Sequence, residues 1–258
     1  MRLRLPGYVR LETPGAAGFV LETCQPALLS ILAGGKETLW DFAARQPGAR
    51  KFTGRATVYT LSLPNGCGDA VVRRSMRGGA LARLNTDLFL PPTRGLRELV
   101  TSLRLRSRGV ATPEILAFAV YHAGTILRRS DVVTREIKES TDLGAFLNDE
   151  SHSEPRSRAL EAVAGLVAAL SRAGAHHSDL NLKNILLSAN GLAEPGVPPA
   201  HVLDVDRIRF HIPGDPIVLS ANIDRLERSI RKWRDRHGLQ MDNTEIAMLR
   251  ARTKELAS

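Results

Sequence analysis

Cysteine is scarce in this sequence. Only Cys24 and Cys67 occur among 258 residues, and neither belongs to a CxxC pair. A disulfide framework needs more cysteines than this, and a zinc site built on thiolates needs closely spaced ones. We therefore expect neither, and a reducing cytoplasm is the compartment that this cysteine usage favours.

Long hydrophobic runs are also missing. No segment approaches the roughly 20 apolar residues that a transmembrane helix needs. The N-terminal stretch "MRLRLPGYVRLE" is basic, but it lacks the apolar centre of a signal peptide. The sequence therefore predicts a soluble chain, or one that at most lies on a membrane surface.

Acidic residues are in deficit. The sequence has 27 Asp and Glu against 36 Lys and Arg, a formal net charge of +9, and the isoelectric point is near 10.2. This balance favours phosphates, nucleic acid or anionic lipid as partners, but it says nothing about the fold. A length of 258 residues allows one large domain or two small lobes.

The first half of the chain is rich in strand patterns. Alternation predicts short strands in "YVRLE" and "GFVLET", and residues 26–48 read as a helix with breaks. "ATVYTLSL" and "AVVRR" flank the turn cluster "PNGCGD", which predicts a hairpin. A helix is expected from Thr93 to about Arg108, ended by Gly109, and two more strands are expected in "EILAFAVYHAG" and "ILRRSDVVTREI".

The second half is mainly helical. We expect a helix in "STDLGAFL" capped by Ser140 or Thr141, a long helix over residues 155–173, and a basic amphipathic helix in "ANIDRLERSIRKWRDRHG". "KNILL" and "AHVLDVDRIRF" read as two short strands. The predicted class is α+β, with a β-rich part over 1–137, a helical part over 138–258 and a cleft between them for a ligand.

The stretch "HHSDLNLKNILL" at 176–187 carries the clearest chemical signal. Asp179 and Asn184 are five residues apart, across a turn that leads into an apolar run. A carboxylate can accept the proton of a substrate hydroxyl, and an amide oxygen suits a hard cation such as Mg²⁺. Asp204 follows at the end of the next apolar run, so the three residue types match the needs of phosphoryl transfer.

These residues resemble the catalytic loop HxDxxxxN of protein-kinase-like enzymes, and "LDVD" resembles their metal-binding strand. The resemblance implies ATP and Mg²⁺ as cofactors, Asp179 as the catalytic base, and Asn184 and Asp204 as metal ligands. It further implies an ATP-binding set with an Arg73–Glu98 ion pair, a phosphate-covering loop at Gly54 and an adenine contact at the Ile137 backbone.

Within that superfamily, "VVRRSMRGG", "TRGLRE", "DLNLKNILL" and "LDVDR" resemble the lipopolysaccharide kinases, a family of 3-deoxy-D-manno-octulosonic acid (Kdo) kinases and WaaP- and InaA-like proteins. The likeness covers roughly 50 to 235. It implies a bilobal kinase-like fold, a Kdo-containing glycolipid or a similar acidic sugar as acceptor, and no nucleic acid partner. It also implies a cytoplasmic location, with possible peripheral contact to the anionic inner membrane.

Several alternatives remain open at this level. Arg74 competes with Arg73 for the phosphate position, because side chains alternate along a strand. Asp206 is either a second carboxylate beside the metal or a partner of Arg207. The apolar stripe of the tail helix either docks onto the helical part or touches anionic lipid. A kinase for protein or another small molecule, or a non-catalytic pseudokinase-like binding protein, would share the same pattern.

Overall fold

A computed structural model describes residues 5–35, 37–53, 57–75, 87–88, 94–124, 126–149, 156–193 and 199–258. The chain divides into two compact units. The first comprises Met1–Val100 and Glu114–Glu136, and the second comprises Thr101–Pro113 and Ile137–Ser258. Residues 101–113 thus group with the second unit, although they precede the expected boundary at 137/138.

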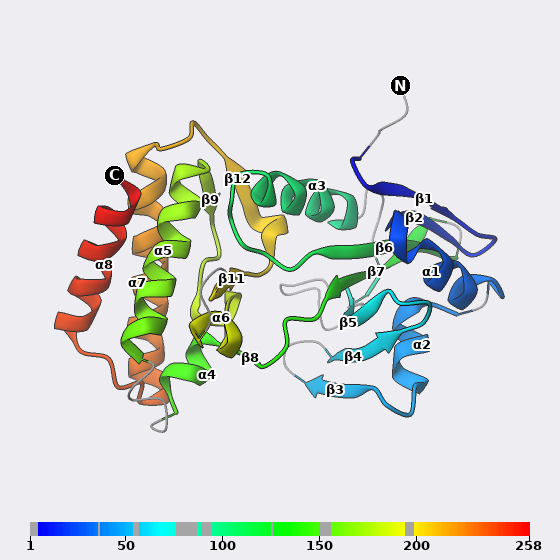
Figure 1. Ribbon diagram of the computed structural model, residues 1–258, viewed down its shortest axis with the longest axis horizontal. Coiled ribbons are helices and arrows are strands. Elements are labelled where there is room, and N and C mark those ends of the chain that lie inside the picture. The colour runs from blue at the N-terminus through cyan, green and yellow to red at the C-terminus, as the bar shows by residue number, and fades with distance from the viewer. Residues whose placement is uncertain are drawn as a thin grey trace. The chain divides into compact units, whose positions relative to one another are not determined.

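The first unit is built on a seven-stranded antiparallel sheet with the order β1-β2-β6-β7-β5-β4-β3 (Figure 1). Its strands are β1 (Tyr8–Glu12), β2 (Ala16–Leu21), β3 (Arg50–Thr53), β4 (Thr57–Leu63), β5 (Gly68–Arg74), β6 (Ile115–Ala123) and β7 (Leu127–Arg135). The predicted hairpin between "ATVYTLSL" and "AVVRR" is present as β4 and β5, which pair from Val58 and Arg73 to Leu63 and Gly68.

Helices cover both faces of this sheet. Helices α1 (Gln25–Leu32) and α2 (Leu39–Arg45) follow the short η1 (Glu22–Cys24). Leu28 and Leu39 are buried in one core with Val72 of the sheet. Helix α3 (Arg94–Arg106) begins against the opposite face, where a Cβ at Gly95 would lie 2.7 Å from Phe118 Cδ2. The predicted start at Thr93 lies outside the described residues, and Gly109 follows the helix end with φ of 74°.

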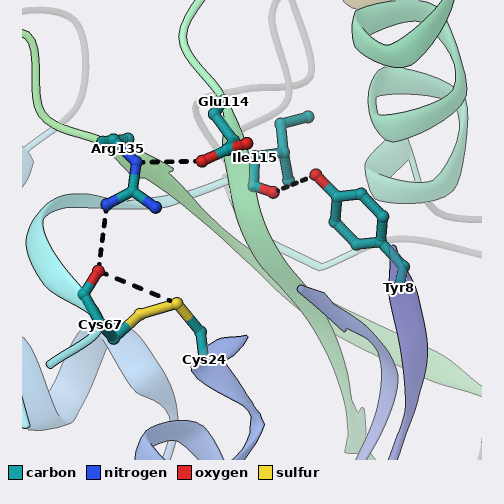
Figure 2. The surroundings of a disulfide bond; sticks show 6 residues. All are labelled: Tyr8, Cys24, Cys67, Glu114, Ile115 and Arg135. Atoms are coloured by element: carbon teal, nitrogen blue, oxygen red, sulfur yellow. Dashed lines mark hydrogen bonds and ion pairs between the residues drawn. A yellow bond between two sulfur atoms is a disulfide. The ribbon is translucent and has the colours of Figure 1, made fainter. Parts of the chain in front are cut away.

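The two cysteines form a disulfide, so the expectation that they build no disulfide is wrong (Figure 2). Cys24 ends η1, Cys67 lies in the β4–β5 turn, and their Cα atoms are 5.0 Å apart although 43 residues separate them in sequence. That distance is normal for a disulfide. Spacing along the chain did not reveal the pair, because only the packing of η1 beside the hairpin brings the residues together. Cysteine usage therefore no longer favours a reducing compartment.

The second unit is mainly helical, and α5, α7 and α8 lie side by side in it (Figure 1). Its helices are α4 (Leu143–Leu147), α5 (Arg156–Arg172), α6 (Ala189–Ala193), α7 (Pro216–His237) and α8 (Asn243–Ala257). Its short strands are β8 (Ser140–Asp142), β9 (Ala175–His177), β10 (Ile185–Ser188), β11 (Ala200–Val202) and β12 (Ile208–Phe210). They form two small sheets, with the orders β11-β10-β8 and β12-β9.

Three predictions for this unit need correction. Ser140 and Thr141 lie in β8, where pairing with β10 holds them extended, and the Asp142 carboxylate caps α4 by accepting the Ala145 N–H at 2.9 Å. "AHVLDVDRIRF" is two strands in different sheets, β11 and β12, separated by η5 (Val205–Arg207). Helix α8 was not expected at all, although Asp242 and Glu245 form a capping box at its start.

The tail helix α7 docks through its apolar stripe. Ile223, Leu226 and Ile230 are buried in the same core as Val163 and Leu170 of α5. This arrangement agrees with docking onto the helical part, and it removes the stripe as a lipid contact. With a β-rich first unit and a mainly helical second unit, the predicted α+β class is confirmed.

Candidate active site

The predicted site residues divide between the two units. Arg73 and Glu98 belong to the first unit, whereas Ile137 and the group Asp179, Asn184 and Asp204 belong to the second. Gly54, predicted for the phosphate-covering loop, lies outside the described residues. The two groups are therefore described separately.

Arg73 and Glu98 form the predicted ion pair. Arg73 Nη2 contacts Glu98 Oε1, which joins strand β5 to the first turns of α3. The Glu98 side chain is only 9% exposed and that of Arg73 is 27% exposed. The guanidinium is thus held by a largely buried carboxylate while part of it stays accessible. Its role in binding ATP stays a prediction.

The neighbouring Arg74 points to the other face of the sheet. Its guanidinium contacts Asp41 at 3.2 Å and Asp131 at 3.3 Å, and it lies 4.6 Å from the centre of the Trp40 ring. Burial raises the pKa of Asp131, although the Trp40 N–H and the Arg74 charge oppose the shift. Arg74 therefore neutralises a buried carboxylate, and strand alternation leaves only Arg73 on the face of α3.

Ile137 lies two residues after the end of β7, at the point where the chain returns to the second unit. Its carbonyl oxygen accepts a hydrogen bond from the Ser140 hydroxyl at 2.6 Å. This contact fixes the segment that leads into β8. An adenine contact at the Ile137 backbone stays a prediction.

The segment from His177 to Asn184 is held by hydrogen bonds within itself. The Nδ2 atoms of Asn181 and Asn184 both donate to the Asp179 carbonyl oxygen at 2.9 Å. Asn181 Oδ1 accepts the Lys183 N–H at 3.0 Å and so caps η4 (Leu182–Asn184). The predicted base and the predicted metal-binding amide therefore share one rigid turn, which we call the catalytic-loop segment (177–184).

His177 is a structural residue of this segment. It is fully buried, its Nδ1 accepts the Asp179 N–H at 3.2 Å, and its Nε2 is 3.0 Å from the Leu203 carbonyl oxygen. Since Nδ1 is an acceptor, the proton is on Nε2, which donates to Leu203. Burial lowers the pKa of His177, in accordance with a neutral ring. Both ring nitrogens are thus committed to the loop and to the segment before Asp204.

Asn184 and Asp204 lie on neighbouring stretches of chain. The Leu203 N–H donates to the Asn184 carbonyl oxygen at 2.9 Å, directly before Asp204. Asp204 has a positive φ of 52°, which turns the exposed residue out of the line of β11. This conformation is uncommon for a residue other than glycine, although Asp adopts it more readily than most.

The donor set fits Mg²⁺. Because the Asn184 nitrogen is bound to the Asp179 carbonyl, its side-chain oxygen is the atom left for a cation, and Asp204 adds a carboxylate. Mg²⁺ commonly takes only one or two protein carboxylates and completes its shell with water and substrate phosphates. No group of three or more His, Cys, Asp and Glu side chains suited to a metal occurs within the described residues.

Helix α7 supports the catalytic-loop segment from outside. Asn222 Oδ1 accepts the His177 N–H at 2.9 Å, and Ser229 Oγ accepts the Leu182 N–H at 3.2 Å. Between them, Arg225 Nη2 lies 2.5 Å from Asp179 Oδ1. Sequence reasoning missed the roles of these three residues, because they lie 45 to 47 residues further along the chain than the residues they contact.

Comparison with known proteins defines the class of this chain. The sequence model of the lipopolysaccharide kinase (Kdo/WaaP) family matches residues 46–249 of this chain. The chain is therefore a phosphotransferase that acts on a sugar hydroxyl. It belongs to the lipopolysaccharide kinase (Kdo/WaaP) family, as its motifs indicated.

Relatives named 3-deoxy-D-manno-octulosonic acid kinase agree with this family. The protein of Xanthomonas oryzae pv. oryzae (strain PXO99A) is 30% identical, over 77% of this chain and 76% of the relative. That of Vibrio vulnificus (strain CMCP6) is 27% identical, over 76% of this chain and 79% of the relative. A solved structure titled "WaaP in complex with acyl carrier protein" is 20% identical, with a TM-score of 0.47, over 90% of this chain and 97% of that chain.

None of the described helices is long and apolar enough to cross a membrane.

Proposed function

We propose that this chain is an ATP-dependent kinase that phosphorylates a hydroxyl of a Kdo residue in the lipopolysaccharide inner core. The observation that carries the proposal is the construction of the catalytic-loop segment, which presents a 38% exposed Asp179 carboxylate from a turn held by buried partners. Family membership and the names of the relatives support the acceptor.

The chemistry asks for a base and for charge neutralisation. Asp179 would accept the proton of the acceptor hydroxyl while the new oxygen–phosphorus bond forms and the bond between the γ-phosphorus and the ADP oxygen breaks. Asn184 and Asp204 would hold Mg²⁺, whose charge would neutralise the nucleotide phosphates. Arg73, steadied by Glu98, would anchor the same phosphates.

The remaining partners follow from the proposed reaction. The backbone at Gly54 would cover the phosphates, and the backbone near Ile137 would meet adenine. Because ATP is a cytoplasmic nucleotide and the acceptor is a membrane glycolipid, we place the chain in the cytoplasm, in peripheral contact with the inner membrane. The net charge of +9 supports an anionic acceptor and an anionic membrane surface.

The test is transfer of labelled phosphate from ATP to a panel of acceptors with the purified chain. We expect Mg²⁺-dependent labelling of Kdo-containing lipid A precursor and its loss by at least about a hundredfold in Asp179→Asn. Labelling only of a protein or of another small molecule would overturn the acceptor. Nucleotide binding with no transfer to any acceptor would favour the pseudokinase-like alternative.

Mass spectrometry of lipopolysaccharide from cells with and without the gene checks the same proposal in the cell. The expected difference is one phosphate on the inner core.

A further inference from the structure

Arg225 is the helix residue that contacts the proposed catalytic base. Its Nη2 atom lies 2.5 Å from Asp179 Oδ1, and the side chains of Arg225 and Asp179 are 26% and 38% exposed. Asp179 is the only partner of Arg225 within the described part of the chain. The pair is therefore partly sheltered but open to a ligand.

The position of Arg225 is fixed by its helix. Asn222, Arg225 and Ser229 are spaced i, i+3 and i+7, so they share one face of α7. The outer two bind the backbone of the catalytic-loop segment at His177 and Leu182, on either side of Asp179. The same helix is anchored in the core by buried Leu226 and Ile230. The Asn222 and Ser229 hydrogen bonds and the buried apolar residues of α7 therefore fix the position of Arg225 beside the Asp179 carboxylate.

The loop itself supplies no cation to the base. Protein kinases usually have a Lys two residues after the catalytic Asp, and this chain has Asn181 there. The Asn181 amide is committed to the backbone, with Oδ1 on the Lys183 N–H and Nδ2 on the Asp179 carbonyl oxygen. Among the described residues, the positive charge at the Asp179 carboxylate comes from α7.

We propose that Arg225 is a positioning residue for Asp179. From a helix distant in sequence, Arg225 supplies the positive charge that the loop lacks. This inference rests on the proposed kinase function. Arg225 holds Oδ1, and no other described residue donates a hydrogen bond to Oδ2. Oδ2 is therefore the atom that takes the proton of the acceptor hydroxyl, and the ion pair fixes its direction.

The experiment measures steady-state kinetics of the full chain with Mg²⁺-ATP and the acceptor that the wild type phosphorylates. For Arg225→Met we expect kcat to fall by roughly a hundredfold, as expected for a misplaced catalytic group, with the KM for ATP unchanged. Arg225→Lys restores part of the loss, because an ammonium group keeps the charge. Arg228→Met, which removes an exposed arginine one turn further along α7, keeps wild-type kinetics.

A second comparison separates positioning from folding. In the Asp179→Asn background, Arg225→Met has no further effect on kcat, because the group that it positions is already lost. A kcat at or above the wild-type value in Arg225→Met overturns the inference. It is also overturned if Arg225→Met lowers kcat by the same factor in the Asp179→Asn background as in the wild type. If Arg225→Met does not fold, the kinetics of Arg225→Lys and Arg225→Gln decide by the same criteria. Full activity in Asp179→Asn alone would instead overturn the proposed function.

Discussion

Two adjacent arginines have different surroundings because they lie on one strand. Arg73 and Arg74 are consecutive in β5, so their side chains point to opposite faces of the sheet. Arg73 meets Glu98 of α3, whereas Arg74 is enclosed by Asp41, Asp131 and the Trp40 ring. The second arginine compensates buried charge, whereas the first keeps part of its guanidinium accessible, which our proposal assigns to the ATP phosphates.

Substitution of the two arginines should therefore have separate effects. We expect Arg73→Met to raise the KM for ATP by roughly ten- to hundredfold, since a charge-assisted contact to phosphate is lost. Arg74→Met should instead lower the free energy of unfolding by about 3 kcal/mol, because Asp131 is left buried without its cation. Urea unfolding and ATP kinetics of both variants check this, and similar effects of the two substitutions would contradict it.

His201 should make the second unit sensitive to acid. Burial lowers the pKa of its imidazole to about 4, and within the described residues its Nδ1 atom has no hydrogen-bond partner. An unfolded histidine titrates near 6.5. As the pH falls from about 6.5 towards 4, the unfolded chain takes up a proton that the folded chain does not, so stability falls over that interval.

We expect His201→Leu to lose less stability than the wild type between pH 7 and pH 5. The replacement has no group that the unfolded state can protonate preferentially. Melting temperatures measured at several pH values in this interval check the prediction. The matched control is His122→Asn, which changes an exposed histidine of the first unit and should keep the wild-type slope.

At the scale of elements, α7 has two roles, one in the core of the second unit and one at the proposed site. One stripe of the helix enters the core, while a polar face holds the catalytic-loop segment. Near its C-terminal end, Trp233 packs so closely on α4 that a Cβ at Gly144 would lie 2.7 Å from the Trp233 ring. This contact helps to fix the helix that carries Arg225.

A methyl group at Gly144 should disturb that contact. We expect Gly144→Ala to lower the free energy of unfolding by about 1–3 kcal/mol through overpacking. Gly165→Ala is the matched control, because Gly165 lies inside α5 with no atom within 4 Å of the added Cβ. It should stabilise the chain by up to about 1 kcal/mol. Urea unfolding of both variants tests this, and equal effects would refute the packing argument.

The disulfide between Cys24 and Cys67 ties η1 to the β4–β5 hairpin. A bridge between residues 43 apart removes enough freedom from the unfolded chain to stabilise the fold by about 4 kcal/mol. We expect the Cys24→Ser/Cys67→Ser variant to lose up to about that amount. Urea unfolding with and without reductant measures it, and the variant itself should be insensitive to reductant.

At the scale of the whole molecule, the surface of α7 that could contact a membrane is positively charged and not apolar. The apolar stripe of α7 is buried, whereas Arg231, Lys232 and Arg236 of the same helix are exposed. If the chain contacts lipid through this helix, the contact is electrostatic and does not insert the stripe. Such a contact depends on anionic lipid and is weakened by salt.

We therefore expect the chain to sediment with vesicles that contain phosphatidylglycerol but not with vesicles of phosphatidylcholine. Binding should fall at high salt and in the Lys232→Gln/Arg236→Gln variant, because each basic residue near an anionic surface contributes about 1 kcal/mol. Binding that persists on neutral vesicles or at high salt would contradict an electrostatic contact. The transfer activity of the variant on a water-soluble acceptor is the control.

Local sequence determined the elements with strong periodicity and clear turns. Most strands of the first unit, the β4–β5 hairpin and the long helices α3, α5 and α7 follow from alternation, helical spacing and turn residues near them in the chain. The residue types at Asp179, Asn184 and Asp204 indicated phosphoryl transfer, and the resemblance of the motifs around them indicated the kinase family, because each motif is a short run of local sequence. The first two residues share a turn that is held by its own hydrogen bonds.

Tertiary structure decided whatever depends on residues far apart in the chain. The disulfide pairs residues 43 apart, β8 replaces an expected helix cap because it pairs with β10, and the choice between Arg73 and Arg74 depends on which helix covers each face of the sheet. Arg225 reaches Asp179 across 46 residues. Periodicity describes one element at a time, so it cannot show which side chain of a helix will meet a loop; the packing of the core fixes that.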